Sequence, residues 1–419
     1  MPTFDTPGQH TYTVPSGVQT IRFTANGSGG GGGSSADDDS TLGANDGGSG
    51  GVGGQAQGTL SVSPGDSYTL YVPSGGSGGA ADGAGGAGGS NGQDSGGAGT
   101  GGANRDQAIY GGGGGGGGAD AIVYDNGTVL IAGEGGGGGG GGGADNDTAY
   151  GGPGGGGARG GEAGVDYLGN VGNDGSGSGD GGDGGDGGTG EAGGAPGDPG
   201  NDGGASVAAA LTNTTTTTGG GGAGGSGGSG FGVAGGSGGA GEVVIEEAPP
   251  APSLTAVAVD AISIKVDIGD TDNEDSAELE YKLSSEPTWT TAATFAAGEL
   301  PATETIIGLL NGRDYDVRIT ATNNVGSSST AITEQTVLPA PTNLTETDSR
   351  DSEIDISWTA NHTNGSTRVE FREDDSGGYQ VFATLSYTET TDTISGLLNG
   401  QLYGIRVVAE TEDAETVDQ

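Results

Sequence analysis

Uninterrupted glycine is the feature that most restricts how this chain can fold. Glycine makes up 104 of the 419 residues, and eleven of these lie after Pro250. The longest runs, Gly111–Gly118 and Gly135–Gly143, contain no other residue. Such tracts usually form flexible linkers, because glycine loses more backbone entropy on folding than any other residue. An ordered glycine tract must therefore satisfy its backbone N–H and C=O groups through neighbouring segments.

Alternating apolar segments lie between the glycine tracts. His10–Phe23 predicts two strands around a Pro-Ser-Gly turn, and Gly58–Val72 predicts a hairpin around a Ser-Pro-Gly-Asp turn. Ala121–Ala132 predicts another hairpin, because its Asn-Gly pair readily takes positive φ. Gly241–Ile245 adds a last strand. These segments predict an antiparallel β-sandwich that is repeatedly interrupted by glycine.

Small residues recur at every third position of several tracts. The series are Ala84, Ala87 and Ser90; Ala223, Ser226 and Ser229; Ala234, Ser237 and Ala240; and Asp180, Asp183, Asp186 and Thr189. The extended left-handed helix has three residues per turn, a rise of about 3.1 Å and no internal hydrogen bonds. Glycine helices packed side by side can bond laterally, which predicts an inserted polyglycine-II bundle with the small residues facing outward. Disorder and collagen, with three triplets at Gly194–Gly203, are the alternatives.

The charge of the chain is strongly one-sided. It has 56 acidic residues against 11 basic ones, a formal net charge of −45, and Lys265 and Lys282 are its lysines. Acid-rich, lysine-poor surfaces of this kind resemble those of proteins from extreme halophiles. Because the chain has no basic patch, we expect no binding to nucleic acid or to anionic membranes.

Several function classes lack their sequence signals. Cysteine is absent, which excludes disulfides and thiolate metal sites. Met1–Asp5 has no charged region followed by an apolar core, so we expect no signal peptide. No run of about 18 apolar residues occurs, so we expect no membrane insertion. His10 and His362 are expected to be isolated surface residues, and no enzyme site is predicted.

Two units that repeat each other follow the proline-rich segment at 248–252: repeat 1 (248–338) and repeat 2 (339–419). The segment Gly308–Gly312 recurs as Gly396–Gly400, and each copy precedes a tyrosine, Tyr315 or Tyr403. Short alternating strands in each unit are typical of an antiparallel sandwich.

Both repeats resemble fibronectin type III domains. The resemblance rests on the leading Pro-x-Pro, on Trp358, on the Leu-x-Asn-Gly-x-x-Tyr corner and on the run at 318–326. Ile268 stands where repeat 1 should carry its tryptophan. Glu410–Gln419 is all that follows the sixth strand of repeat 2, so its last strand is expected to be short or supplied by a partner. The family implies binding or spacing and no chemistry.

Residues 1–247 resemble a glycine-rich domain of phage tail proteins. The likeness rests on Thr11–Val18, on the Tyr-Asp-Asn-Gly hairpin before a long glycine run, and on the Gly-Ala-Gly-Glu-Val-Val-Ile ending. The region is similar, more loosely, to tail-fibre tip adhesins of T4-like phages and to an extracellular glycine-rich region of some receptor kinases.

Two kinds of candidate site follow. Tyrosines at the tract ends are candidate receptor-binding residues, because an exposed ring is a low-entropy contact for a receptor or glycan; they are Tyr110, Tyr150 and Tyr167. Calcium needs six to eight oxygen ligands, for which acidic clusters are candidates; these are Asp37, Asp38, Asp39, Asp180, Asp183 and Asp186. The apolar residue that follows the Asp in the calcium-binding β-roll repeat is missing, which favours solvated acidic faces and no cofactor.

The sequence therefore predicts an all-β chain: a glycine-rich sandwich with a polyglycine-II bundle at 1–247, and two fibronectin type III-like domains at 248–338 and 339–419. We expect a virion structural protein of a haloarchaeal tailed virus, a tail fibre that attaches to the host. Its expected partners are copies of itself in a trimer, other tail or baseplate proteins, and a host surface glycan or S-layer glycoprotein. A capsid turret or decoration protein and a haloarchaeal cell-surface adhesin are the alternatives.

The charge gives a first testable prediction. The unfolding temperature should rise by roughly 10 °C or more between about 0.1 M and about 3 M KCl, since about 1 M salt already shortens the Debye length to roughly 3 Å. Circular dichroism melts measure this, with a near-neutral fibronectin type III tandem as the control. An unfolding temperature that does not change with salt would contradict a halophilic surface.

Overall fold

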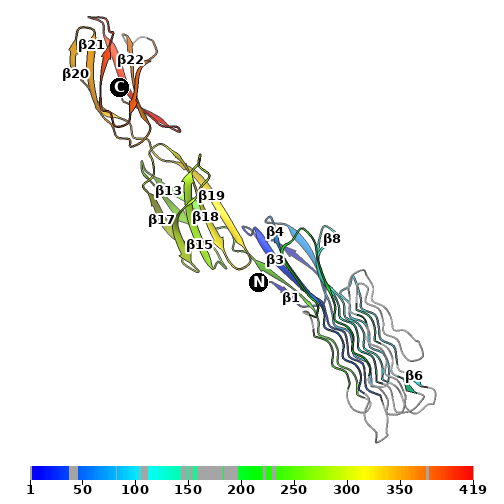
Figure 1. Ribbon diagram of the computed structural model, residues 1–419. Helices are drawn as coiled ribbons and strands as arrows, with labels where there is room; N and C mark the ends of the chain where they lie inside the picture. The colour runs from blue at the N-terminus through cyan, green and yellow to red at the C-terminus, as the bar shows by residue number, and fades with distance from the viewer. Residues whose placement is uncertain are drawn as a thin grey trace. The chain divides into compact units, whose positions relative to one another are not determined.

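A computed structural model shows an all-β chain (Figure 1). The structure describes residues 2–36, 46–81, 83–101, 103–104, 112–142, 149–150, 154–157, 183, 197–219, 223–228, 233–373 and 377–418. The chain divides into two compact units, Met1–Glu247 and Ala248–Gln419. Each unit is built from antiparallel sheets, as the sequence predicts.

The first unit contains two sheets of five strands. One sheet has the order β1-β12-β3-β4-β11, with strands β1 (Thr3–Phe4), β12 (Glu242–Glu247), β3 (Thr20–Asn26), β4 (Gln55–Ser61) and β11 (Thr212–Thr217). The other has the order β10-β8-β7-β5-β2, with β10 (Ala205–Val207), β8 (Thr128–Gly133), β7 (Ala121–Asp125), β5 (Ser67–Val72) and β2 (Gly8–Thr13). A short pair, β6 (Ala103–Asn104) and β9 (Ala149–Tyr150), lies outside these sheets.

The two sheets enclose one hydrophobic core. Its largest fully buried side chains are Phe23, Ile21, Leu70, Ile131 and Ile245. Every second residue of β3 is buried, so the period-two pattern at 21–25 places one face of the strand in the core. The rings of Phe23 and Tyr68 meet edge to face across the two sheets, with their centroids 5.2 Å apart.

One predicted hairpin is wrong and the other is confirmed, and the two strands predicted around the Pro-Ser-Gly turn are present but lie in different sheets. The Pro-Ser-Gly turn carries the chain from β2 in one sheet to β3 in the other, and the Ser-Pro-Gly-Asp turn likewise separates β4 from β5. Both turns therefore connect the two sheets and do not close hairpins. β7 and β8 do pair directly, and their turn has positive φ at Asn126 (47°) and Gly127 (81°).

The glycine segments continue from the ends of these strands and are joined by backbone hydrogen bonds (Figure 1). Successive N–H groups of residues 27–35 donate to three different segments in turn and return to the first after three residues. The pairs are Gly30 N to Gly51 O (3.0 Å), Gly31 N to Gly116 O (2.8 Å), Gly32 N to Gly236 O (2.9 Å) and Gly33 N to Gly48 O (2.8 Å). Carbonyl groups of the same residues accept from three further segments, through the N–H groups of Gly225, Gly139 and Gly79. Residues 27–35 thus have six bonded neighbours, and we call the whole array the glycine lattice.

Burial separates the inner segments of the glycine lattice from the outer ones. All residues of 27–36, 112–120 and 133–142 are buried. In the outer segments 83–90 and 223–228 every third residue is exposed, as predicted for Ala84, Ala87 and Ser90 and for Ala223 and Ser226. A Cβ added at the inner glycines Gly31, Gly33, Gly115 and Gly138 would lie 1.9–2.2 Å from a neighbouring carbonyl oxygen. This explains why residues 112–118 and 135–142, which are all glycine, lie in the interior.

The second unit consists of two sandwiches with the same strand order. Repeat 1 pairs β13 (Leu254–Val259), β14 (Ser263–Ile268) and β17 (Ala302–Ile307) in one sheet and β16 (Thr290–Ala296), β15 (Ser276–Leu283), β18 (Asp314–Thr322) and β19 (Ser327–Gln335) in the other. Repeat 2 pairs β20 (Thr342–Arg350), β21 (Glu353–Thr359) and β24 (Thr391–Ser395), and β23 (Gln380–Ser386), β22 (Ser366–Glu373), β25 (Tyr403–Glu410) and β26 (Glu415–Asp418).

The repeated sequence motifs take equivalent places in the two repeats. Trp358 is buried in the core of repeat 2, and Ile268 is buried in the core of repeat 1. The hydroxyl of Tyr315 accepts a hydrogen bond from the Leu310 N–H at 2.9 Å, and that of Tyr403 accepts one from the Leu398 N–H at 2.8 Å. The tyrosine therefore fixes the preceding Leu-Leu-Asn-Gly loop in both repeats.

The glycine lattice gives a second testable prediction. A Cβ at Gly31 would lie 2.1 Å from the Ser77 carbonyl oxygen, so Gly31→Ala forces neighbouring backbone apart. Such overpacking costs about 1–3 kcal/mol or more and outweighs the gain of up to about 1 kcal/mol from a stiffer unfolded chain. We expect a lower unfolding temperature for the first unit, measured by calorimetry. Ser49→Ala, at an exposed position of an outer segment, is the matched control and should be near neutral. Equal stability of the two variants would contradict the close packing.

Candidate functional site

The predicted receptor-binding and calcium residues fall almost entirely outside the described residues. The candidates outside the described residues are Tyr110, Tyr167, Asp37, Asp38, Asp39, Asp180 and Asp186. Tyr150 belongs to β9, and its backbone pairs with Ala103. Asp183 is exposed, and its carbonyl oxygen accepts the Asn201 N–H at 2.8 Å. Among the described residues, the structure brings none of the candidates together.

Two searches of the described part of the chain bear on metals and membranes. No group of three or more His, Asp or Glu side chains there is arranged to hold a metal ion. No helix in that part is long and apolar enough to cross a membrane.

The two histidines differ in their surroundings. Nε2 of His10 lies 2.7 Å from the Thr6 carbonyl oxygen near the surface. His362 is 3% exposed, so the prediction of a surface residue is wrong for this position. Its Nε2 lies 3.2 Å from Thr367 Oγ1. Burial lowers the pKa of His362, although a backbone hydrogen bond with Ser366 opposes part of the shift.

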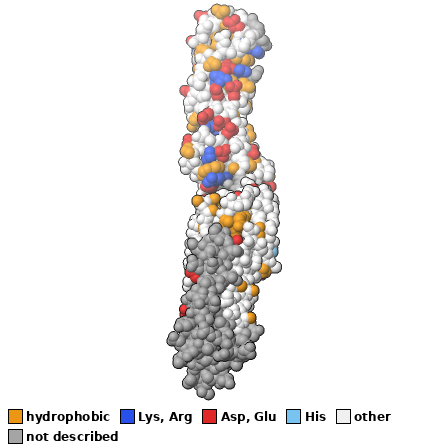
Figure 2. Space-filling model, turned by 90° about the vertical axis from the view of Figure 1, so that its right-hand side faces the viewer, with side chains coloured by type: hydrophobic (Ala, Val, Ile, Leu, Met, Phe, Trp, Pro, Cys, Tyr) orange, Lys and Arg blue, Asp and Glu red, His pale blue; other side chains and the backbone are white. Residues whose placement is uncertain are grey.

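Basic side chains are concentrated in the second unit, which holds eight of the eleven Lys and Arg residues. Figure 2 shows them beside acidic side chains on the visible face of that unit. In repeat 1, the Arg318 guanidinium lies 4.1 Å from the centre of the Trp289 ring, and its Nε donates to Glu280 at 2.6 Å. In repeat 2 the equivalent residues are Tyr379, Arg406 and Glu370.

Glu370 is the most buried carboxylate of these ion pairs. Burial alone would raise its pKa, but hydrogen bonds from Arg406 and Arg368 hold the pKa of Glu370 below its ordinary value. Arg368 also forms ion pairs with Glu410 and Glu415. One arginine is thus shared among three glutamates in a chain that has few basic residues. This stack of ring, arginine and glutamate was not predicted, although its members recur at equivalent positions of the two repeats.

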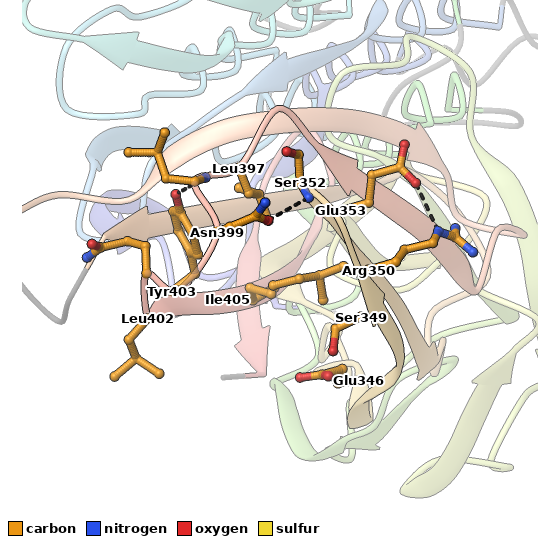
Figure 3. Close-up of a pocket in the computed structure, with 14 residues that line it drawn as sticks. Glu346, Ser349, Arg350, Ser352, Glu353, Leu397, Asn399, Leu402, Tyr403 and Ile405 are labelled. Carbon is orange, nitrogen blue, oxygen red and sulfur yellow. Dashed lines mark hydrogen bonds and ion pairs between the residues drawn. The ribbon is translucent and has the colours of Figure 1, made fainter.

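Repeat 2 has a groove among its described residues (Figure 3). Its volume is about 360 Å³. It is lined by the end of β20, the start of β21, the Leu-Leu-Asn-Gly loop and the start of β25. The lining residues include Arg350, Leu398, Gln401, Leu402, Tyr403 and Ile405.

The walls of the groove are held by specific bonds (Figure 3). The Ser352 N–H donates to Asn399 Oδ1 at 2.9 Å, which joins the loop to the β20–β21 turn. Arg350 Nε donates to Glu353 at 2.9 Å on the opposite wall. Leu398 and Leu402 remain 65% and 71% exposed beside the groove. The groove thus combines an apolar rim at Leu398 and Leu402 with charged side chains at Glu346, Arg350 and Glu353.

A difference between the two repeats in sequence could have predicted this groove. The loop of repeat 1 continues as Arg313-Asp314, whereas that of repeat 2 continues as Gln401-Leu402. Two charged residues are thus replaced by a neutral one and an apolar one at equivalent surface positions.

The fibronectin type III domain family matches residues 339–417, which is repeat 2. Such domains are typical of adhesion and cell-surface proteins. A search of curated protein sequences gives no significant match to the chain.

Two solved structures are similar to part of this chain. One is a two-domain fibronectin type III segment from chicken tenascin, with 18% identity and a TM-score of 0.33; the match covers 41% of this chain and 99% of that one. The other is the FN1–FN3 segment of chicken CNTN1, with 14% identity and a TM-score of 0.21; it covers 41% of this chain and 65% of that one.

The buried histidine gives a third testable prediction. Because the pKa of folded His362 lies below the unfolded value of about 6.5, the unfolded chain binds the extra proton. The free energy of unfolding of repeat 2 therefore has its highest value above about pH 6.5. It decreases as the pH drops toward the folded-state pKa of His362.

Guanidinium unfolding at about pH 7.5 and about pH 5.5 measures this, a range chosen to bracket the ordinary histidine pKa. Trp289→Phe leaves Trp358 as the single tryptophan, so its fluorescence reports repeat 2 alone. His362→Gln should remove most of the pH dependence. An unfolding midpoint that is the same at both pH values with His362 present would contradict the prediction.

Proposed function

We propose that this chain is a virion structural protein of a tailed virus that infects a halophilic archaeon, and that it attaches the virus to its host as a tail fibre. The proposal joins three features: a glycine-rich unit, two fibronectin type III-like sandwiches and a net charge of −45. The main support is the glycine lattice, in which the glycine-rich segments are joined by backbone hydrogen bonds.

We interpret the glycine lattice as a polyglycine-II bundle. The partner of each N–H changes with a period of three residues, which is the period of the extended left-handed helix. Residues 27–35 bond to six neighbours, three antiparallel and three parallel to them. The same period places one residue in three at the surface of the outer segments. Strands would give a period of two, which supports this interpretation.

A scaffold of this kind suits recognition. Its stability comes from backbone bonds, so the residues that connect its segments are free of the requirement for glycine. In the sequence, Tyr110, Tyr150 and Tyr167 stand at the ends of glycine tracts. We propose that these tyrosines contact a host surface glycan or S-layer glycoprotein.

The remaining parts fit the same role. The two fibronectin type III-like domains serve as spacers or as secondary glycan binders. The acidic surface keeps the protein folded and soluble in molar salt, where charge repulsion is screened. We propose a closed homo-oligomer, a trimer, joined to other tail or baseplate proteins, with no nucleic acid partner, no membrane insertion and no catalytic activity.

Two alternatives use the same features. A capsid turret or decoration protein would need the same rigid, salt-adapted surface. A haloarchaeal cell-surface adhesin is favoured by the fibronectin type III domain in repeat 2, since such domains are typical of cell-surface proteins.

The fourth prediction concerns where the protein is found. Mass spectrometry of gradient-purified particles from a haloarchaeal lysate should find this chain at a fixed copy number relative to the major structural proteins. Immunogold labelling of the particles then separates tail from capsid. Absence from particles, together with recovery from the host envelope, would overturn the viral proposal in favour of the adhesin.

A further inference from the structure

The strand β11 lies at the end of its sheet and is exposed on both faces. Among the described residues it pairs with β4 on one side and with no strand on the other. All six of its residues are exposed, whereas every second residue of β3 in the same sheet is buried. Because neither face of β11 covers the core, its outer backbone groups and its side chains are accessible to a partner.

The chain leaves the core just before this strand. Leu211 is buried and lies against Gly58 of β4. A bulge follows at Asn213, which has a φ of 48°, and the register shifts between Thr212 and Thr215. Beyond the bulge, residues 215–217 pair in regular register with residues 57–55. This part of β11 therefore presents a regular sheet edge, although a bulge lies beside it.

The edge belongs to the longest charge-free stretch of the chain. Residues 203–241 contain no Asp, Glu, Lys, Arg or His, in a chain whose net charge is −45. The stretch includes β10 and β11, which are end strands of the two sheets, and β4 beside β11 also has no charged residue. Copies of so acidic a chain repel each other, so a contact between copies is least costly where charge is absent.

The sequence of the edge reads the same in both directions. Residues 214–218 are five threonines. A contact about a two-fold axis requires a surface that is complementary to itself. Two such strands place threonine opposite threonine when they pair antiparallel, and Thr–Thr pairs stabilise antiparallel sheets. The edge therefore fits a second copy of this chain.

We propose that β11 pairs antiparallel with β11 of a second copy about a two-fold axis, so that two five-stranded sheets become one continuous sheet. The axis is perpendicular to the sheet, which keeps the same face of both strands on the same side. Thr215 and Thr217 of the two copies then meet across the axis. The proposal does not depend on a role in a virion. It is also separate from the proposed trimer, because a two-fold contact joins chains, or trimers, in pairs.

Sedimentation velocity of the full chain in about 1 M KCl measures this pairing, since salt at that concentration screens the long-range repulsion. The contact is small, so we expect reversible pairing with a dissociation constant of roughly 10–100 µM. Amide hydrogen exchange at residues 214–218 should become slower as the concentration of the chain is raised.

Thr215→Glu together with Thr217→Glu places like charges opposite each other across the axis. Both side chains are exposed, so the fold should not change, and pairing should weaken at least about tenfold. Thr11→Glu together with Thr13→Glu is the matched control, because these residues are exposed on β2, an end strand of the other sheet. The control should pair as tightly as the unsubstituted chain.

A mixture of variants provides a second test, whose result a loss of folding cannot imitate. Thr215→Lys together with Thr217→Lys supplies the opposite charge at the same two positions. This lysine variant should bind the glutamate variant more tightly than either variant binds itself, because unlike charges then meet across the axis.

Three results would overturn the proposal. One is the absence of pairing up to about 200 µM, a concentration above the expected dissociation constant. Another is pairing of equal strength in the glutamate variant and in the unsubstituted chain. The third is pairing that leaves amide exchange at residues 214–218 unchanged, because another surface would then hold the copies together.

Discussion

The hydrogen bond between glycine backbones of neighbouring segments is the interaction on which the first unit depends. These bonds measure 2.7–3.0 Å throughout residues 27–35 and join that segment to six others. Where the inner residue is glycine they leave no room for a side chain, since a Cβ at Gly31 or Gly33 would lie 2.1 or 1.9 Å from a neighbouring carbonyl oxygen. Because buried N–H and C=O groups without partners are costly, the segments are stable together and not singly. The β-sandwich supplies the alignment, since its strands enter the glycine lattice from their ends.

Features of the fold that follow from local pattern could be predicted from the sequence. The β7–β8 hairpin follows from Asn126-Gly127, and the outward faces follow from the three-residue spacing of Ala84, Ala87 and Ser90. Strand pairing across turns could not be predicted at Ser63–Asp66, because a four-residue turn that joins two sheets has the same composition as one that closes a hairpin. Which partner a strand selects is decided by the core, through residues such as Phe23 and Leu70.

The candidate site was harder to predict than the fold. The tyrosines and aspartates were predicted from their chemistry and not from a shared position, and of these candidates the described residues include Asp183 and Tyr150. The apolar rim of the groove at Leu398 and Leu402 could be recognised only by comparing the two repeats. Burial of His362 was missed, because a loop residue enters the core only through tertiary packing.

Amide hydrogen exchange of the first unit in molar salt tests the central claim most directly. If the glycine lattice is formed, the amides of residues 27–35, 112–118 and 135–142 exchange as slowly as those of β3 and β7, because both open only with the unit as a whole. Exchange of these glycine amides at the rate of an unfolded chain, while β3 and β7 remain protected, would contradict the account. The sandwich would then be folded with its glycine tracts unpaired, and the scaffold proposed for recognition would not exist.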